Sequence, residues 1–392
     1  MKAVTWQGRR DVRVENVADP RIQEPTDAVI RVTSSGLCGS DLHLYEILGP
    51  YMTPGDILGH EPIGVVEEVG GAVDGLSVGD RVVVPFQISC DACWMCGRGL
   101  QSQCETTQVR ETGMGAALFG YSALYGQVPG GQAEYLRVPL AATTAVRVEH
   151  GPPDDRYVYL SDVLPTAYQG LEYAAVPEGG TLVVLGLGPI GQMVARLAVH
   201  RGVRTIGVDL VPERLARAAR HGAEVLDATD GGLTERILEM TSQRGPESVV
   251  DAVGMEAHGS PVTKAAQSAV GVLPDVVAKP LMDHVGMDRL AALTTAIEVV
   301  QRGGTLSLSG VYGGAADPLP MLTLFDKQVS LRMGQANVRR WIPDLLPLVE
   351  DPSDPLGVED FATHHLTLDE APEAYATFQR KGDGMQKVLF RP

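Results

Sequence analysis

The five cysteines of this chain fall into two groups whose spacing suggests two kinds of chemistry. Four of them lie within fifteen residues, with two, two and seven residues between successive members: Cys90, Cys93, Cys96 and Cys104. Four thiolates at such short separations can enclose one tetrahedral zinc ion and complete its coordination, as structural zinc sites do. The fifth, Cys38, lies far from them in the segment Gly-Leu-Cys-Gly-Ser-Asp-Leu-His and is left for other chemistry.

The composition is that of an enzyme-sized globular protein. The chain has 392 residues, 44% of them hydrophobic, and a mean hydropathy near zero, which suggests two or three domains. Its formal net charge of −17 argues against nucleic acids and acidic membrane surfaces as partners, because both would be repelled. A nucleotide cofactor held locally and a small-molecule substrate remain compatible with this charge.

No sequence feature indicates export or membrane insertion. The N-terminal residues contain no signal-peptide stretch, and no segment offers about 18 consecutive apolar residues for a membrane span. We therefore expect a cytoplasmic protein. In a reducing compartment clustered cysteines are metal ligands more often than disulfides, and an odd total also fits poorly with complete pairing, so disulfides are the minor alternative.

The hydrophobic pattern predicts two types of domain. Short β-branched runs punctuated by Gly, Pro and Asp indicate a mainly-β region and lie at residues 28–32, 63–69 and 81–84. From Thr181 the pattern becomes strand 181–185, glycine turn 186–191, helix 192–200 and strand 204–209. This βαβ unit opens a doubly wound parallel sheet, which further strands at 248–251 and 305–309 continue.

The connection between Gly254 and Arg302 is longer than one helix and its loops require. We expect an insertion over residues 255–290 that packs over part of the nucleotide-binding domain, and an extra surface helix without a role is the alternative. The final part of the chain returns to mixed structure, with a helix starting within 369–375 and a terminal strand at 387–390.

A dinucleotide-binding fingerprint follows the strand at 181–185. Gly186 permits a tight turn, Gly188 lets the backbone approach a pyrophosphate, and Gly191 allows close packing of the following helix. Asp209 ends the next strand, where it can accept hydrogen bonds from ribose hydroxyls and repel a 2′-phosphate, so NAD is favoured over NADP. Arg214 can contact ribose or phosphate. A glycine turn with a purely structural role is the alternative.

Three other residues able to bind a metal are spread along the chain, so spacing does not connect them. Cys38 alone is more often a small buried hydrophobic residue than a ligand. His60, in Leu-Gly-His-Glu-Pro, is equally compatible with a hydrogen-bonded loop histidine, and Asp162 stands alone. Residue types and spacing leave both interpretations open.

The ordered set of motifs resembles the zinc-dependent medium-chain alcohol dehydrogenases over essentially the whole chain. The motifs that carry the resemblance are residues 36–43, 59–66, the four-cysteine lobe 90–104, 130–135 and the glycine turn 186–191. Residues 160–166 and 251–254, with the long insertion, most resemble the formaldehyde dehydrogenases that do not need glutathione. The resemblance implies an α/β protein with a mainly-β GroES-like catalytic domain (1–163), a Rossmann NAD-binding domain (164–333), a return to the catalytic domain (334–392), and a dimer or tetramer.

In this family the catalytic zinc would be held by Cys38, His60 and Asp162, with one position left open, and a second zinc by the four-cysteine lobe. Many relatives have a cysteine where Asp162 stands. Glu61 would be an intermittent ligand or a neighbour of the ligands, and Asp41 would orient His60. Solvated loop carboxylates are the alternative for Glu61 and Asp41.

The resemblance also assigns roles around the reaction. Ser40 matches the hydroxyl that takes the proton of the alcohol, and His43 the solvent-side end of that relay; a turn-forming serine and a surface histidine are the alternatives. Phe86 matches an aromatic residue lining the substrate pocket, or is ordinary core. Further positions that would contact the cofactor are Thr166, Pro189, Ile190, Val253, Ser309, Gly310 and Val311.

The leading hypothesis is therefore an oxidoreductase that uses zinc and NAD to transfer hydride to or from a small alcohol or an aldehyde hydrate. A polyol or sugar-alcohol dehydrogenase is the enzymatic alternative. A protein that binds NAD and zinc without turnover is the alternative from another class.

Overall fold

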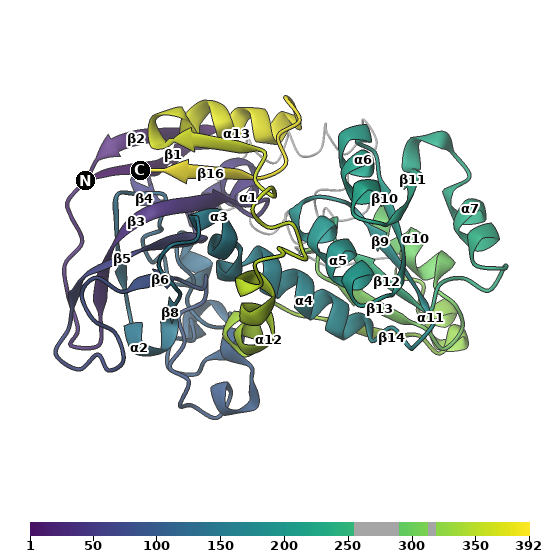
Figure 1. Cartoon of the computed structure of the whole chain (residues 1–392), viewed down its shortest axis with the longest axis horizontal. Helices are drawn as coiled ribbons and strands as arrows, with labels where there is room; N and C mark the ends of the chain where they lie inside the picture. The colour runs from purple at the N-terminus through teal and green to yellow at the C-terminus, as the bar shows by residue number, and fades with distance from the viewer. Residues whose placement is uncertain (255–289, 313–318) are drawn as a thin grey trace. The chain divides into compact units, whose positions relative to one another are not determined.

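The computed structural model describes residues 1–254, 290–312 and 319–392, which form two compact units. Residues Met1–Pro165 and Ala336–Pro392 make up the first unit, and Thr166–Gln335 the second (Figure 1). The first is rich in antiparallel strands and the second contains one parallel sheet covered by helices. The predicted α/β fold class is thereby confirmed, whereas residues 255–289 of the expected insertion lie outside the described part of the chain.

The first unit contains a seven-stranded sheet and a three-stranded sheet. Six strands of the larger sheet follow the order β15-β16-β3-β5-β6-β8, and the seventh, β7, pairs with β3. The smaller sheet has the order β2-β1-β4. Its strands are β1 (Lys2–Gly8), β2 (Asp11–Asn16), β3 (Ala28–Leu37), β4 (Asp56–Ile57), β5 (Pro62–Val69), β6 (Arg81–Val83), β7 (Tyr135–Val138), β8 (Val146–Arg147), β15 (His364–Thr367) and β16 (Val388–Arg391). The strand β3 is central because it pairs with β5, β7 and β16.

Helices of the first unit were only partly predicted. They are α1 (Asp41–Glu46), α2 (Ala141–Thr144), α3 (Asp154–Tyr157), α12 (Val338–Glu350) and α13 (Ala371–Arg380). The helix α13 follows a capping box in which Thr367 and Glu370 satisfy each other's backbone groups. The helix α12 carries Pro343 and Pro347 in its interior, residues that normally argue against a helix, and it forms because its buried face includes Trp341 and Leu345.

The second unit is built on a six-stranded parallel sheet of order β11-β10-β9-β12-β13-β14. The strands are β9 (Thr181–Leu185), β10 (Arg204–Asp209), β11 (Glu224–Asp227), β12 (Ser248–Asp251), β13 (Thr305–Leu308) and β14 (Ser330–Met333). The direction of strand addition reverses at β9, which starts both halves of the sheet. Such a reversal creates a crevice at the carboxyl ends of the strands, where dinucleotides bind in folds of this kind.

Both faces of this sheet are covered by helices (Figure 1). The helices are α4 (Val163–Ala174), which begins in the first unit's last residues, α5 (Pro189–His200), α6 (Pro212–Arg220), α7 (Leu233–Met240), α10 (Ala291–Val299) and α11 (Met321–Lys327). Val183 and Leu185 belong to the core under α7 and α10, so the alternate residues Leu182 and Val184 face the opposite side. The helix α5 begins at Pro189 rather than at the predicted Gln192, because proline fits the first helical position.

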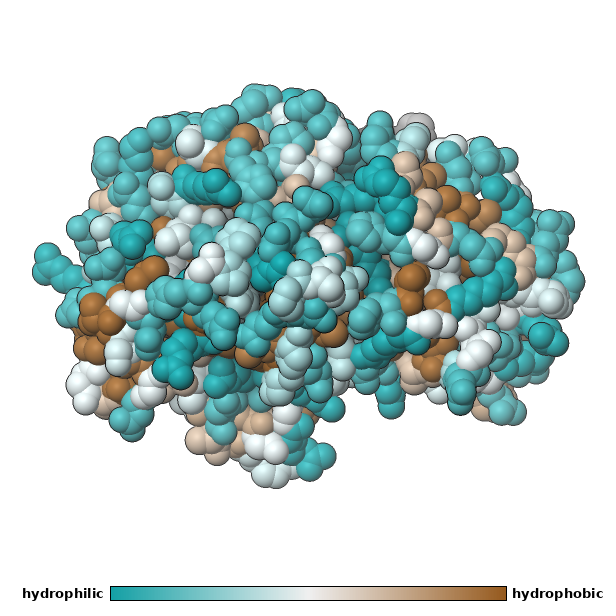
Figure 2. Space-filling view, viewed as in Figure 1, coloured by the Kyte–Doolittle hydropathy of each residue, from teal (hydrophilic) through white to brown (hydrophobic). Residues whose placement is uncertain are grey.

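The surface in view is mostly hydrophilic, with small hydrophobic areas between hydrophilic residues (Figure 2). This agrees with the strongly negative formal charge. Among the described residues, no helix has both the length and the apolar composition that crossing a membrane requires.

Candidate active site

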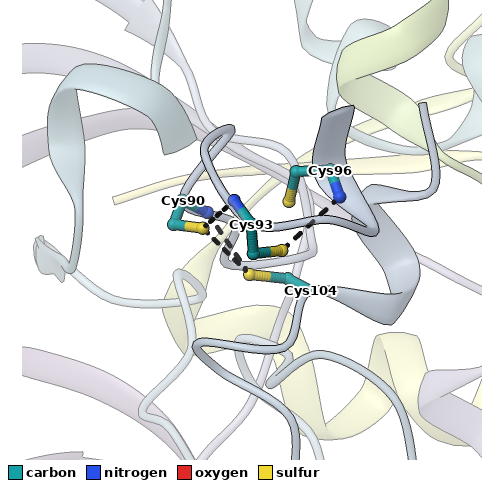
Figure 3. A group of neighbouring side chains, drawn as sticks. All are labelled: Cys90, Cys93, Cys96 and Cys104. Carbon is teal, nitrogen blue, oxygen red and sulfur yellow. Dashed lines mark hydrogen bonds between the residues drawn. The ribbon is translucent and has the colours of Figure 1, made fainter. Parts of the chain in front are cut away.

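The four clustered cysteines converge on one point in the first unit (Figure 3). The sulfur atoms of Cys90, Cys93, Cys96 and Cys104 all lie within 4.8 Å of one another, and none is in a disulfide. The chain around them forms short 3-10 turns rather than regular helices, at Cys96–Arg98 and Gln101–Gln103. Loops of this type fold back on themselves over few residues, which places four consecutive thiols around a single centre.

Hydrogen bonds to the sulfur atoms prepare this lobe for thiolates. The Cys93 amide donates to Cys90 Sγ at 3.3 Å, and the Glu105 amide donates to Cys93 Sγ at 3.3 Å. Burial opposes ionisation of Cys93, but the amides of Cys96 and Glu105 together lower the pKa of its thiol. Burial and the neighbouring thiols raise the pKa of Cys96. Four sulfurs with no other donor suit a closed, tetrahedral zinc site.

The second group of donors combines four side chains that are distant in sequence. One ligand atom from each of Cys38, His60, Glu61 and Asp162 lies within 4.8 Å of the others. Cys38 follows the end of β3, and His60 and Glu61 precede β5, which pairs with β3. Asp162 occupies the break between a 3-10 turn (Val158–Ser161) and α4. Antiparallel pairing of two strands therefore brings three of the four donors together.

Burial and the neighbouring carboxylates shift the pKa values of this group. Burial, followed by the charges of Asp162 and Glu61, raises the pKa of Cys38 to about 12. Burial disfavours a charged His60, yet Asp41 and Asp162 raise the pKa of its ring well above the usual value. The carboxylates contribute to both shifts in the direction that favours positive charge at this group. One thiolate, one imidazole and one carboxylate make a typical donor set for a catalytic zinc with an open position.

The serine beside this group points its hydroxyl at the donors. Ser40 Oγ lies 3.3 Å from Cys38 Sγ and 3.1 Å from His60 Nε2. Ser40 precedes α1, but its side chain makes no capping hydrogen bond to that helix. The alternative of a turn-forming serine therefore loses its main support, because the hydroxyl faces the metal-binding group instead.

Asp41 lies buried next to the donor group and is not solvated. Its carboxylate is fully buried, accepts a hydrogen bond from the Cys38 amide at 3.0 Å, and places Oδ1 3.2 Å from His60 Nδ1. The last two atoms are not aligned for a hydrogen bond. Gln132 Nε2 donates to Asp41 Oδ2 at 3.3 Å, and the Tyr375 hydroxyl donates to Gln132 Oε1 at 2.8 Å. A buried network thus holds the Asp41 carboxylate beside the ring of His60.

Glu61 is also fully buried, which overturns its alternative as a solvated loop carboxylate. Its Oε2 pairs with the Nζ of Lys387, which is itself fully buried and also donates to the Leu37 carbonyl at 3.2 Å. Its Oε1 has no hydrogen-bond partner among the described residues. Gly36 makes room for this carboxylate, because a Cβ there would lie 1.9 Å from Glu61 Oε2.

Aromatic rings flank the imidazole of His60. Phe86 lies with its ring centroid 6.1 Å from that of His60, and Tyr121 with its centroid 6.4 Å away, both edge-on. Burial raises the pKa of Tyr121. His43, on α1, is buried with 7% of its surface exposed, so the alternative of a surface histidine is wrong.

The glycine turn of the second unit requires glycine at two of its three glycine positions and is open at the third. Gly186 has a φ of +85°, and a Cβ there would lie 2.6 Å from Val253 Cγ2. A Cβ on Gly191 would lie 1.8 Å from the Gly186 carbonyl oxygen. At Gly188 a Cβ would meet nothing closer than Arg214 Nη1 at 3.9 Å, so the turn is open on that side. Gly188 precedes α5, which begins at Pro189 and has Ile190 in its first turn.

Asp209 ends β10 and is already bonded to the backbone. It accepts hydrogen bonds from the amides of Leu187 at 2.6 Å, Leu210 at 2.7 Å and Val211 at 2.9 Å. Arg214 Nη1 lies 3.6 Å from its Oδ2. Two carboxylate oxygens provide about four acceptor positions, so one stays available for a ribose hydroxyl.

The remaining predicted cofactor positions lie on one helix and after two strands. Thr166 is on α4, whereas Val253 follows β12 and the others follow β13: Ser309, Gly310 and Val311. Val311 is the most open of these, with 56% of its surface exposed. The carboxyl ends of β9, β12 and β13 therefore carry the glycine turn and the other predicted contacts of this sheet.

Three residues of the site were missed in the sequence. Lys387 contacts Glu61 across 326 residues of chain, Tyr121 faces His60, and Tyr375 ends the network behind Asp41. No motif marks them, because their partners are brought near only by strand pairing and core packing. A fourth missed residue, Gln132, lies inside the Gly-Gly-Gln-Ala-Glu-Tyr motif, which is a signal in the sequence that could have indicated it.

Comparison with known proteins gives a consistent result. The alcohol dehydrogenase GroES-like domain model matches residues 24–148, and the zinc-binding dehydrogenase model matches residues 189–272. The uncharacterized zinc-type alcohol dehydrogenase-like protein AdhB of Bacillus subtilis is 38% identical, with all of both chains covered. A glutathione-independent formaldehyde dehydrogenase of Pseudomonas aeruginosa is 32% identical, with 96% of this chain and 94% of the relative covered.

Among solved structures, alcohol dehydrogenase TADH from Thermus sp. ATN1 is 33% identical. It superposes with a TM-score of 0.81 over 100% of this chain and 99% of the other. Sequence identity of this extent over complete chains, together with the two domain models, confirms the predicted family. The chain belongs to the zinc-dependent alcohol dehydrogenases of the medium-chain family and is an oxidoreductase.

Proposed function

We propose that this protein uses zinc and NAD to interconvert a small alcohol, or the hydrate of an aldehyde, with its oxidised product. The observation that carries the proposal is the position of Ser40, whose hydroxyl lies within 3.3 Å of both Cys38 Sγ and His60 Nε2. A proton acceptor beside an open donor set is needed for turnover and has no purpose in a protein that only binds metal. The alternative of a non-catalytic binding protein is therefore disfavoured.

The residues present fit a catalytic zinc. Cys38, His60 and Asp162 would hold it, and Glu61, with one unpartnered carboxylate oxygen among the described residues, stands ready as a further oxygen donor. When bound, zinc would supply positive charge that makes an alcohol more acidic, and the nicotinamide would supply the hydride acceptor. The lobe of four cysteines would hold a second, structural zinc.

The chain's own residues would handle the proton and the orientation. Ser40 would accept the proton of the alcohol, and His43 would pass it on towards solvent. Gln132 would hold the Asp41 carboxylate in place, and the charge of that carboxylate, 3.2 Å from Nδ1, would favour one orientation of the His60 ring. Phe86 and Tyr121 would form an apolar wall beside the reacting carbon.

A small, weakly polar substrate suits this wall better than a polyol. Two aromatic rings flank His60, and they offer one phenol hydroxyl rather than several charged or amide groups for sugar hydroxyls. The formaldehyde dehydrogenase relative of Pseudomonas aeruginosa, named above, acts on a substrate of this kind. A polyol or sugar-alcohol dehydrogenase is the second candidate.

Asp209 favours NAD over NADP because its carboxylate would repel a 2′-phosphate. Arg214 acts in the other direction, since a guanidinium 3.6 Å from that carboxylate could attract the phosphate. We expect Asp209 to decide, and an Asp209→Gly variant to raise the ratio of NADP to NAD efficiency by about a hundredfold. Steady-state kinetics with both cofactors measures this ratio.

We also propose that the protein is a homo-oligomer that associates through β14. This edge strand pairs only with β13 among the described strands, and Leu331 and Met333 on it are exposed. Phe325 on the preceding α11 has 82% of its surface exposed. An apolar free edge tends to pair with another strand, and a second copy pairing antiparallel about a two-fold axis closes the assembly. A Met333→Lys variant should be smaller than wild type by light scattering.

An assay of NADH formation tests the catalytic proposal. Zinc-loaded protein is supplied with NAD and with formaldehyde, aliphatic alcohols, aromatic alcohols and polyols. Turnover of the small alcohols or formaldehyde supports the proposal, and turnover of polyols alone supports the second candidate. Absence of turnover with all four classes, in protein shown to contain zinc, would favour the non-catalytic alternative.

A further inference from the structure

A buried carboxylate at the end of β12 connects two loops of the second unit. Asp251 has no exposed surface, and its Oδ1 accepts hydrogen bonds from the amides of Val253 at 2.9 Å and Gly254 at 3.4 Å. Its Oδ2 accepts a hydrogen bond from the hydroxyl of Tyr312. One carboxylate therefore hydrogen-bonds to residues after β12 and also to a residue after β13.

The main chain of Asp251 adds to this connection. Its carbonyl oxygen accepts hydrogen bonds from the amides of Ser309 and Gly310, each at 2.9 Å. The two loops then touch backbone to backbone, because a Cβ on Gly310 would lie 2.3 Å from the Gly254 amide nitrogen. A Cβ on Gly254, whose φ is +57°, would lie 2.6 Å from the Val311 amide nitrogen. Neither loop can shift without moving the other.

Burying this carboxylate is costly. Burial raises the pKa of Asp251, and the hydrogen bonds from Tyr312, Val253 and Gly254 oppose that rise. Within residues 1–254, 290–312 and 319–392, no basic side chain forms an ion pair with it. Without a counterion among these residues, the buried charge depends on its hydrogen bonds, and those made within the described part of the chain all lead to these two loops.

The order of the sheet indicates which part of a cofactor these loops serve. The glycine turn follows β9, and Asp209, the expected ribose partner, ends β10 on one side of it. The ends of β12 and β13 lie on the other side of β9. A dinucleotide extends across such a reversal with its pyrophosphate at the glycine turn, so the half remote from adenosine falls at β12 and β13.

We propose that Asp251, together with Tyr312, is a positioning residue for the nicotinamide end of the cofactor. The pair fixes Val253, Ser309, Gly310 and Val311 as one rigid surface, and neither residue touches the reacting atoms. This inference rests on the proposed binding of NAD. It predicts that loss of the pair weakens binding of the nicotinamide half and spares binding of the adenosine half.

Two ligands separate these effects: NADH, which has the nicotinamide, and ADP-ribose, which lacks it. Their dissociation constants are measured by calorimetry for wild type, Tyr312→Phe and Asp251→Ala. Tyr312→Phe removes one hydrogen bond to a carboxylate, so we expect NADH to bind about tenfold more weakly and ADP-ribose within about twofold of wild type. Asp251→Ala should have a larger effect of the same selectivity. Tyr173→Phe, the same change on α4 outside the two loops, is the control and should change neither constant.

The outcomes separate this inference from the proposed function. If wild type binds both ligands and Tyr312→Phe binds NADH as tightly as wild type, the inference is overturned while the cofactor proposal stands. An equal loss of both ligands in Tyr312→Phe also overturns it, because that indicates general loosening. Should Asp251→Ala fail to fold, Tyr312→Phe decides alone. If wild type binds neither ligand, the proposed cofactor is wrong and the inference falls with it.

Discussion

The two candidate zinc sites of the first unit are built on opposite plans. The lobe takes four identical ligands from one short stretch of chain, with backbone amides pointing at the sulfurs. The other group takes three kinds of ligand from distant segments and surrounds them with Ser40, Asp41 and Lys387. A zinc site that only stabilises the fold needs ligands. A catalytic zinc site also needs an open coordination position and neighbouring side chains that control protons and charge.

This difference predicts that the two sites fail in different ways. Asp162→Ala removes a ligand of the mixed group and should lower kcat/KM by roughly ten-thousandfold, about 5 kcal/mol, because the metal is lost or misplaced. The free energy of unfolding should change much less. Asp162→Cys, which restores a side chain that can bind zinc, is the matched control and should retain zinc and part of the activity.

The buried ion pair of the mixed group should be sensitive to removal of one partner. Lys387→Met leaves Glu61 charged and buried without its counterion, and we expect the free energy of unfolding to fall by about 3 to 4 kcal/mol. Adding Glu61→Gln should recover part of that loss, since the double change removes both charges. Urea unfolding of Lys387→Met, Glu61→Gln and the double variant measures the coupling, and strictly additive losses would show that the pair does not act as a unit.

Ser40→Ala should affect catalysis without affecting metal binding. We expect kcat to fall about a hundredfold, or about 2.7 kcal/mol, with zinc content unchanged. Ser40→Thr keeps a hydroxyl and should retain most of the rate. Equal rates for wild type and Ser40→Ala would mean that another group accepts the proton.

The smallest expected effect comes from the lobe. Cys96→Ser weakens a closed site, so we expect the free energy of unfolding to fall by about 2 kcal/mol and the zinc content by one ion, while kcat per folded chain stays within about twofold of wild type. Thermal unfolding and metal analysis test this. A large loss of kcat in protein that is still folded would place the lobe in the catalytic machinery.

How much of the site could be predicted depends on how local each interaction is. The lobe was predicted from spacing alone, because its four ligands are neighbours in sequence. The glycine turn was predicted because strand, turn, helix and Asp209 follow one another in order. Cys38, His60 and Asp162 were linked only through resemblance to a family, since strand pairing brings them together.

Interactions that depend on packing were not predicted. Lys387 reaches Glu61 from the last strand of the chain, and neither residue carries a local signal of the other. The solvated alternatives for Asp41 and Glu61 were wrong, because exposure depends on the core that closes over them. The helix α12 was missed since its two prolines argue against a helix locally, while its buried face stabilises it.

Zinc content per chain tests most directly the division into one closed and one open site. We expect two zinc ions per wild-type chain by mass spectrometry of the purified protein, and one in Asp162→Ala, which should remain folded but inactive. One zinc in wild type, or two in an active Asp162→Ala, would contradict the division of the ligands between a structural and a catalytic site.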